Sequence, residues 1–223
     1  MDKFQKEKND FLIKIDKSKK HSYDKKIIKL VNLINKNPNY YTTSSCSGRT
    51  RIFEKNDRRY DVKDIFVNHD KTEINNKITD DIINKIKNRI NYSINEKINN
   101  SIIDKKRINK NIINKKTLNK NQNRIYFQYE SLILHVCCRT IEDANKILKI
   151  ARKISFKRSG IITKDRKIII EIINPEYVYT LISKDNKLLI DGNYLKELLK
   201  EANEKMQRNE EKIQEFYDLS KIL

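Results

Sequence analysis

The chain has 223 residues, which is enough for one domain with a substantial core and short for two independent ones. Lysine and arginine number 49 against 30 aspartates and glutamates, giving a formal net charge of +19. This excess favours a polyanionic partner, above all nucleic acid, although an AT-biased genome that enriches lysine, asparagine and isoleucine explains much of it equally well. No apolar run approaches the roughly 20 residues that cross a bilayer, so no membrane segment is predicted.

The three cysteines point away from metal and disulfide chemistry. Cys46, Cys137 and Cys138 form no CxxC pair and join no His/Cys cluster at zinc-ligand spacing. The first ten residues are charged and have none of the features of a secretory signal. We therefore expect no metal ion and a reducing, cytoplasmic environment.

In the N-terminal third, periodicity predicts two helices and then strands. Residues 3–15 and 23–35 are predicted as helices, the second with its apolar side chains on one face and Pro38 after its end. Small polar residues dominate 41–49, which is predicted as a loop leading to strands at 51–54 and 62–69.

Residues 71–122 consist almost wholly of Asn, Lys, Ile, Asp and Glu, without Gly or Pro. Isoleucine recurs every fourth residue from 74 to 102, so an apolar stripe drifts by about 40° per step round a helix of 3.6 residues per turn. A helix that packs against a core needs its apolar residues on one face along its length. The sequence therefore predicts a peripheral low-complexity insertion, partly helical or disordered.

The C-terminal part has clearer signals. Residues 126–138 are rich in β-branched and aromatic side chains, as in one or two buried strands. Thr140 begins a capping-box-like helix start, and strands are predicted at 161–163 and 168–173. An amphipathic C-terminal helix is expected at about 193–217.

The order of elements in the two halves is similar: an amphipathic helix, a Ser-Gly loop, a strand, a polar turn and a second strand. We therefore predict one α+β domain over 1–223, with a mixed sheet, flanking helices and an internal duplication. The only glycines, Gly48, Gly160 and Gly192, cannot form a GxGxxG loop, which excludes the Rossmann type of methyltransferase or dinucleotide site.

Two polar loops are candidate binding sites. Small hydroxyl side chains, a permissive glycine and a fixed cation can together line a carboxylate, a phosphate or the edge of a nucleobase. An ordinary turn is the competing interpretation of the first loop. The candidates are Ser44, Ser45, Ser47, Gly48 and Arg49 in this loop, and Ser159 and Gly160 in the second.

The remaining candidate site residues lie outside these two loops. His69 and His135 lie at or in predicted strands, where a histidine is often structural. Arg139 follows the strand of His135 and is either a phosphate contact or a surface cation. Cys46 has no evident base beside it and is interpreted as a small packed thiol.

Five blocks, at 16–20, 40–49 (YYTTSSCSGR), 66–70, 132–139 and 156–161, resemble in order the signature blocks of the tRNA wybutosine-synthesising protein 3 family. The resemblance covers 10–70 and 125–206. It implies transfer of a methyl group from S-adenosylmethionine to N4 of the tricyclic base made from the guanosine at position 37, in the anticodon loop of tRNA-Phe. The chain departs from the family pattern in lacking Gly and Trp before His69, and in having Asn68 and Lys20 where serine and glycine are usual.

Methyl transfer from a sulfonium depends mainly on positioning, but the acceptor N–H must also lose a proton. His69, His135 and Asp16 are the candidate bases, and the residues leave the choice open. Arg49 and Arg139 are candidates to hold tRNA phosphate or the cofactor carboxylate.

Two other functions remain open: a non-catalytic RNA-binding protein, and a methyltransferase for another RNA or a protein. We expect a monomer.

Overall fold

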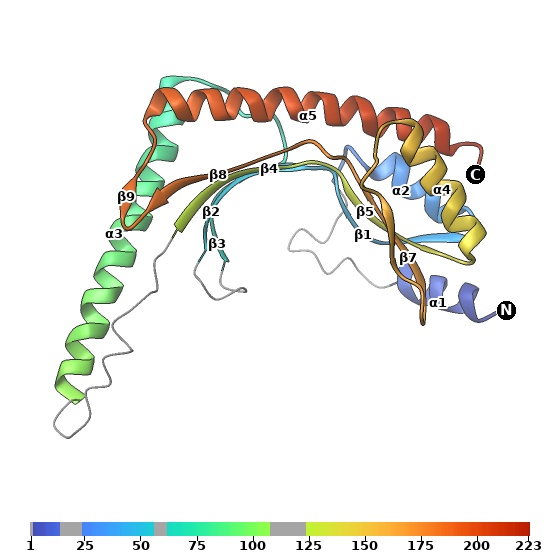
Figure 1. Cartoon of the computed structure of the whole chain (residues 1–223), viewed down its shortest axis with the longest axis horizontal. Coiled ribbons are helices and arrows are strands. Elements are labelled where there is room, and N and C mark those ends of the chain that lie inside the picture. Colours follow the sequence, from blue (N-terminus) through green and yellow to red (C-terminus); the bar gives the residue numbers. More distant parts are fainter. Residues whose placement is uncertain (1, 14–23, 56–61, 108–123) are drawn as a thin grey trace. The chain divides into compact units, whose positions relative to one another are not determined.

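The computed structural model describes residues 2–13, 24–55, 62–107 and 124–223 (Figure 1). These residues form two compact units, each with a sheet of its own. The first unit comprises Met1–Arg49, Glu130–Tyr177 and Glu204–Leu223, and the second comprises Thr50–Tyr129 and Val178–Asn203. The two units are described separately below.

The first unit contains a four-stranded antiparallel sheet in the order β1-β5-β7-β6. Its strands are β1 (Tyr40–Cys46), β5 (Ile133–Cys138), β6 (Gly160–Thr163) and β7 (Ile168–Ile173). Its helices are α1 (Lys3–Leu12), α2 (Ile28–Lys36), α4 (Ile141–Lys153) and the C-terminal part of α5 (Gly192–Ser220).

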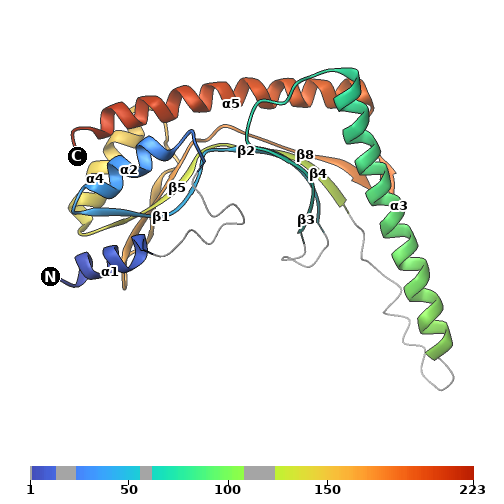
Figure 2. The same ribbon diagram turned by 180° about the vertical axis from the view of Figure 1, so that it is seen from behind.

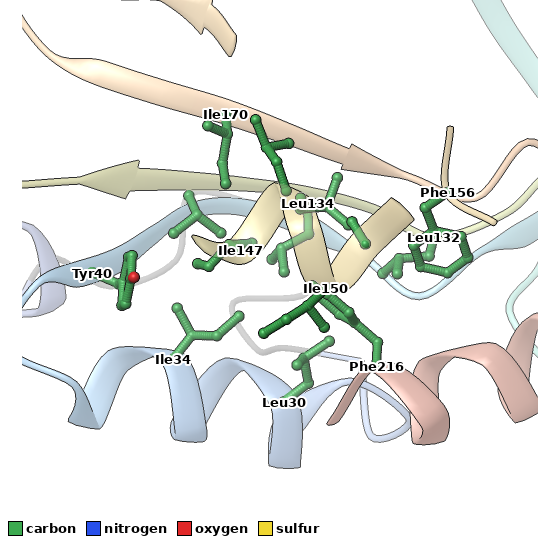
Figure 3. Close-up of a cluster of buried hydrophobic side chains, with 14 of the residues drawn as sticks. Leu30, Ile34, Tyr40, Leu132, Leu134, Ile147, Ile150, Phe156, Ile170 and Phe216 are labelled. Atoms are coloured by element: carbon green, nitrogen blue, oxygen red, sulfur yellow. The ribbon is translucent and has the colours of Figure 1, made fainter. Parts of the chain in front are cut away.

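The core of the first unit lies between one face of this sheet and the helices α2, α4 and α5 (Figure 3). Alternation along β5 sends Leu134 and Val136 to the core and His135 to the opposite face. The start of α4 is capped as the sequence predicts, because the Thr140 hydroxyl accepts a hydrogen bond from the backbone N–H of Asp143 at 3.1 Å.

Helix α1 lies on the other face of the sheet from α2 and α4 (Figure 1). Phe4 and Phe11 pack on the ring of Tyr41 with centroid distances of 5.4 and 5.5 Å. Tyr41 pairs with Cys137 on β5, so α1 covers that end of the face. The end that carries Ser44 and His135 is more exposed.

The second unit contains a five-stranded sheet in the order β3-β2-β4-β8-β9. Figure 2 labels four of these strands, β2, β3, β4 and β8. Its strands are β2 (Arg49–Lys55), β3 (Val62–Asn68), β4 (Arg124–Glu130), β8 (Tyr177–Lys184) and β9 (Lys187–Leu188). Helix α3 (Asn76–Arg107) and the N-terminal part of α5 supply much of its buried surface.

The first part of α3 is firmly docked, which corrects the prediction of a peripheral insertion for this segment. Ile82, Ile86 and Ile90 are 1%, 0% and 9% exposed. The buried Glu54 of β2 bonds the guanidinium of Arg89 and the hydroxyl of Ser93, 2.8 Å away. The drift of a four-residue spacing is small over two or three turns, so a short stretch of the stripe keeps one face.

Other predictions are confirmed or corrected in detail. The α+β class is confirmed. A mixed sheet was expected, and the strand registers described for both sheets are antiparallel. The polar run over 41–49 is mostly the strand β1, since its backbone pairs with β5. The internal duplication stays a prediction. Within the described residues, no helix has the length and apolar character that a membrane span requires.

Candidate active site

A polar row crosses the exposed face of the four-stranded sheet. Ser44 on β1 pairs with His135 on β5, His135 pairs with Glu171 on β7, and Glu171 pairs with Gly160 on β6. Residues paired in this way project from the same face of a sheet. Three of the predicted site residues therefore share one row, although they lie far apart in sequence.

At the centre of this row, Nε2 of His135 lies 3.0 Å from Oε1 of Glu171. The two side chains are 30% and 33% exposed, so a ligand can reach them. Donation from Nε2 to the carboxylate fixes the tautomer in which Nδ1 carries the lone pair. The ring is thereby oriented to accept a proton at Nδ1.

Glu171 was not predicted from the sequence. It is the single charged residue in the strand Ile168–Ile173, whose other members are all isoleucine. Its neighbours Ile170 and Ile172 are fully buried, so alternation sends the carboxylate to the opposite face. A single acidic residue in an otherwise apolar strand is the sequence signal from which Glu171 could have been predicted.

The second Ser-Gly loop makes different contributions to this face. The hydroxyl of Ser159 accepts the backbone N–H of Ile173 at 3.0 Å, so the 5%-exposed Ser159 ties β6 to β7. A Cβ on Gly160 would meet no atom within 4 Å, so the face is open at this point. Ser45 pairs with the core-facing Leu134, so it is half-buried and projects from the other face of the sheet.

The turn from β1 to β2 is held by charged partners. The hydroxyl and the backbone N–H of Ser47 donate to Oδ2 of Asp24 at 3.1 and 3.2 Å. Nε of Arg49 donates to Oε2 of Glu130 at 3.0 Å, and the Arg49 side chain is 32% exposed. Arg49 is therefore a cation in a fixed position, as phosphate or carboxylate recognition requires.

Gly48 and Asn209 make this turn possible. Gly48 has a φ of +114°, and a Cβ there would lie 3.0 Å from the backbone oxygen of Glu130. Asn209 of α5 is 0% exposed; its amide donates to the oxygen of Ser47 at 2.7 Å. Its own oxygen accepts the backbone N–H of Leu132 at 2.9 Å and the amide of Asn174 at 3.0 Å.

The two Ser-Gly loops lie at the same end of the sheet but on opposite edges. Strands β1 and β6 are the edge strands, with β5 and β7 between them. Three strand spacings separate the edges by about 14 Å. The loops therefore flank the His135–Glu171 row, and an extended ligand suits this arrangement better than one small pocket.

Arg139 lies at the other end of β5, in a basic pocket of about 300 Å³. Its guanidinium bonds the side chain of Asp2, holding the pKa of that carboxyl below its usual value, and it covers the ring of Phe4 at 4.8 Å. The acid Glu7 pairs with Lys167 at 3.1 Å. The cations that line the pocket are Lys3, Arg139, Lys164, Arg166 and Lys167.

The structure does not test the other two candidate bases, His69 and Asp16. His69 follows β3 in the second unit, whereas the row described above is built from the first unit alone. Asp16 lies outside the described residues. A catalytic role for either residue stays a prediction.

The described cysteines are free thiols with raised pKa values. Burial raises the pKa of Cys46 and of Cys137, and raises that of Cys138 to about 12. A thiol rather than a thiolate is present at neutral pH, which agrees with the interpretation of Cys46 as a packed side chain.

Comparison with known proteins identifies the family. The sequence model described as Methyltransferase TYW3 matches residues 6–221. The chain belongs to this family. It is 30% identical to the tRNA wybutosine-synthesizing protein 3 homolog of Danio rerio over 96% of this chain and 73% of that one.

An archaeal relative and a solved structure agree with this result. The tRNA(Phe) 7-((3-amino-3-carboxypropyl)-4-demethylwyosine(37)-N(4))-methyltransferase 1 of Pyrococcus abyssi is 28% identical over 96% of this chain and 93% of its own. The structure of the PH1069 protein from Pyrococcus horikoshii superposes with a TM-score of 0.70 at 25% identity, covering 96% of this chain and 94% of the other. The family consists of methyltransferases, and the non-Rossmann fold is confirmed.

Proposed function

We propose that the chain transfers a methyl group from S-adenosylmethionine to N4 of the 7-(3-amino-3-carboxypropyl)-4-demethylwyosine base at position 37 of tRNA-Phe. The observation that carries this proposal is the family match over 6–221, nearly the whole chain. The archaeal relative at 28% identity is named for this reaction and aligns with the chain over 93% of its own length.

The exposed polar face fits such a cofactor chemically. S-adenosylmethionine offers a carboxylate, an ammonium group, a sulfonium and ribose hydroxyls. Arg49 complements the carboxylate, while Ser44 complements the hydroxyls. The absence of any atom near a Cβ on Gly160 leaves room for a ligand against the sheet.

The cofactor supplies an electrophilic methyl group for an in-line displacement by the acceptor nitrogen. The chain contributes orientation and the removal of one proton. His135 accepts the proton of the acceptor N–H at Nδ1, and Glu171 stabilises the imidazolium that forms and keeps the ring in place.

The basic pocket round Arg139 binds phosphates of the tRNA backbone. Its five cations outnumber the two acids Asp2 and Glu7 that pair with Arg139 and Lys167, so the pocket is complementary to phosphate. Lys164 and Arg166 are exposed cations in the turn between β6 and β7.

Changing both Lys164 and Arg166 to alanine is expected to weaken tRNA binding about equally for every tRNA. Each lost phosphate contact reduces the slope of log K against log salt by about one, so the slope should fall by about two. The measurement is a titration at several salt concentrations, with Lys196→Ala and Lys200→Ala on α5 together as the matched control. An unchanged slope would assign phosphate binding to other cations.

The test of the proposed function is mass spectrometry of tRNA-Phe after incubation with the protein and S-adenosylmethionine. We expect a gain of one methyl group on the position-37 base, only in tRNA that carries the demethylated tricyclic precursor. A non-catalytic RNA-binding protein would bind tRNA with no mass change. A methyltransferase for another substrate would also leave this tRNA unmodified, yet would bind the cofactor saturably.

A further inference from the structure

Three aromatic rings gather on one face of the five-stranded sheet in the second unit. Phe53 on β2, Tyr126 on β4 and Tyr179 on β8 come from three adjacent strands. The rings of Tyr126 and Tyr179 are 5.0 Å apart with their planes 21° from parallel, and those of Phe53 and Tyr126 are 5.8 Å apart at 26°. The three rings are called the aromatic platform below.

The platform lies on the opposite face from the helices of its unit. Along β4, Ile125, Phe127 and Tyr129 are buried, while Tyr126 and Gln128 alternate with them and are half-exposed. Glu54, which bonds residues of α3, identifies the helix-covered face of β2. The platform is therefore separate from the core that α3 and α5 cover.

The rings converge more closely than flat strands allow. Strands β2 and β8 are two spacings apart, which is about 9.6 Å in a flat sheet. The centroids of Phe53 and Tyr179 are nevertheless only 6.4 Å apart. The rings thus lean together over β4, with Phe53 at 3% exposure innermost and Tyr179 at 46% outermost.

A cation completes this surface. The guanidinium of Arg51 lies 4.2 Å from the centroid of Phe53, and its Nε donates to Gln128 at 3.0 Å. Asp64 lies 3.9 Å from the same guanidinium and is 42% exposed. Arg51 is therefore held against the rings, beside an aromatic face that a flat ligand can cover.

We propose that the aromatic platform stacks unpaired nucleobases of RNA, with Tyr179 as the ring on which the base lies. Every base presents a flat π-face, and stacking on exposed aromatic rings of a sheet is a general way to hold single-stranded RNA. The net charge of +19 makes the chain complementary to a polyanion, which favours RNA over an apolar protein segment. The inference rests on the proposed function, since it names how that substrate is held.

The test measures binding without the methyl donor, so that it is independent of turnover. The probe is a labelled RNA hairpin that reproduces an anticodon stem with its unpaired loop, compared with a fully paired RNA of equal length. Tyr179→Ala is expected to weaken hairpin binding about tenfold and to leave the duplex unchanged. Tyr179→Phe should bind the hairpin within about threefold of the wild type, because the ring remains.

A salt titration distinguishes stacking from charge. Tyr179→Ala removes no cation, so the slope of log K against log salt should stay the same while the affinity falls. Tyr92→Ala is the matched control, because Tyr92 is 56% exposed on α3 with Arg89 5.0 Å from its ring, and it lies outside the platform. It should bind as the wild type does. If Tyr179→Ala is unstable, Tyr179→Leu keeps apolar bulk without a flat ring.

Three results would overturn the inference: wild-type affinity in Tyr179→Ala and Tyr179→Leu, equal losses for hairpin and duplex, or an equal loss in Tyr92→Ala. A wild-type protein that binds the hairpin no better than the duplex would also overturn it. Failure of the proposed function is a separate result, because it shows as unmodified tRNA-Phe by mass spectrometry whatever the hairpin affinity.

Discussion

Replacing His135 by glutamine is expected to lower kcat for methyl transfer by about 10²- to 10⁴-fold, the range for loss of a general base. The glutamine amide keeps a hydrogen bond to Glu171 but cannot take a proton. Because binding of tRNA is distributed over many other contacts, KM for tRNA should change little. The measurement is the initial rate of methyl transfer over a range of concentrations of tRNA-Phe that carries the precursor base.

Glu171→Gln is expected to have a smaller effect of the same kind. Glu171 acts through His135, so its loss should lower kcat by about tenfold with KM nearly constant. The matched control is Glu142→Gln, since Glu142 is an exposed carboxylate at the start of α4. Folding is checked by the unfolding temperature of each variant. Turnover at the wild-type rate in a folded His135→Gln protein would exclude His135 as the base and direct attention to His69 and Asp16.

The elements that the sequence predicted best are those fixed by local patterns. The start of α4 follows from Thr140 and the acids after it, and the apolar periodicity of α5 continues over many turns. These signals arise within one or two helical turns, where neighbouring residues decide the conformation. Both helices lie close to their predicted positions.

The strand β1 and the partner of His135 depend on contacts between distant residues. Polar residues such as Ser44 and Ser45 have weak strand preference, and β1 forms because β5, about 90 residues later, supplies its hydrogen-bond partners. Glu171 becomes a candidate only once β5 and β7 are known to be neighbours. Registers of this kind have no local sequence signal, so the row could not be assembled from sequence.

Helix α3 shows a limit of periodicity as evidence. The isoleucine spacing of four drifts over the full length of the repeat, yet Ile82, Ile86 and Ile90 face the sheet together. The ion pair of Arg89 with the buried Glu54 adds a polar anchor that composition does not reveal. The isoleucine stripe winds round the helix over eight repeats, but over three repeats it stays on one buried face.

A large loss of stability is expected from Asn209→Ala. The change leaves the oxygen of Ser47, the N–H of Leu132 and the amide of Asn174 without their present partner in a buried region. Each unmade buried hydrogen bond costs about 1–3 kcal/mol, so the free energy of unfolding should fall by about 4 kcal/mol. Urea denaturation measures this, and Gln214→Ala on the exposed side of α5 should cost under about 0.5 kcal/mol.

Gly48→Ala is expected to cost about 2–5 kcal/mol, because a φ of +114° is strained for alanine and its Cβ would crowd the oxygen of Glu130 at 3.0 Å. The same Cβ would lie 3.1 Å from Nδ2 of Asn209. Removing that amide relieves part of the crowding, so the double variant Gly48→Ala, Asn209→Ala should lose less stability than the sum of the single losses. Strict additivity would mean that the two residues act independently at this turn, and that backbone strain alone makes a glycine necessary at position 48.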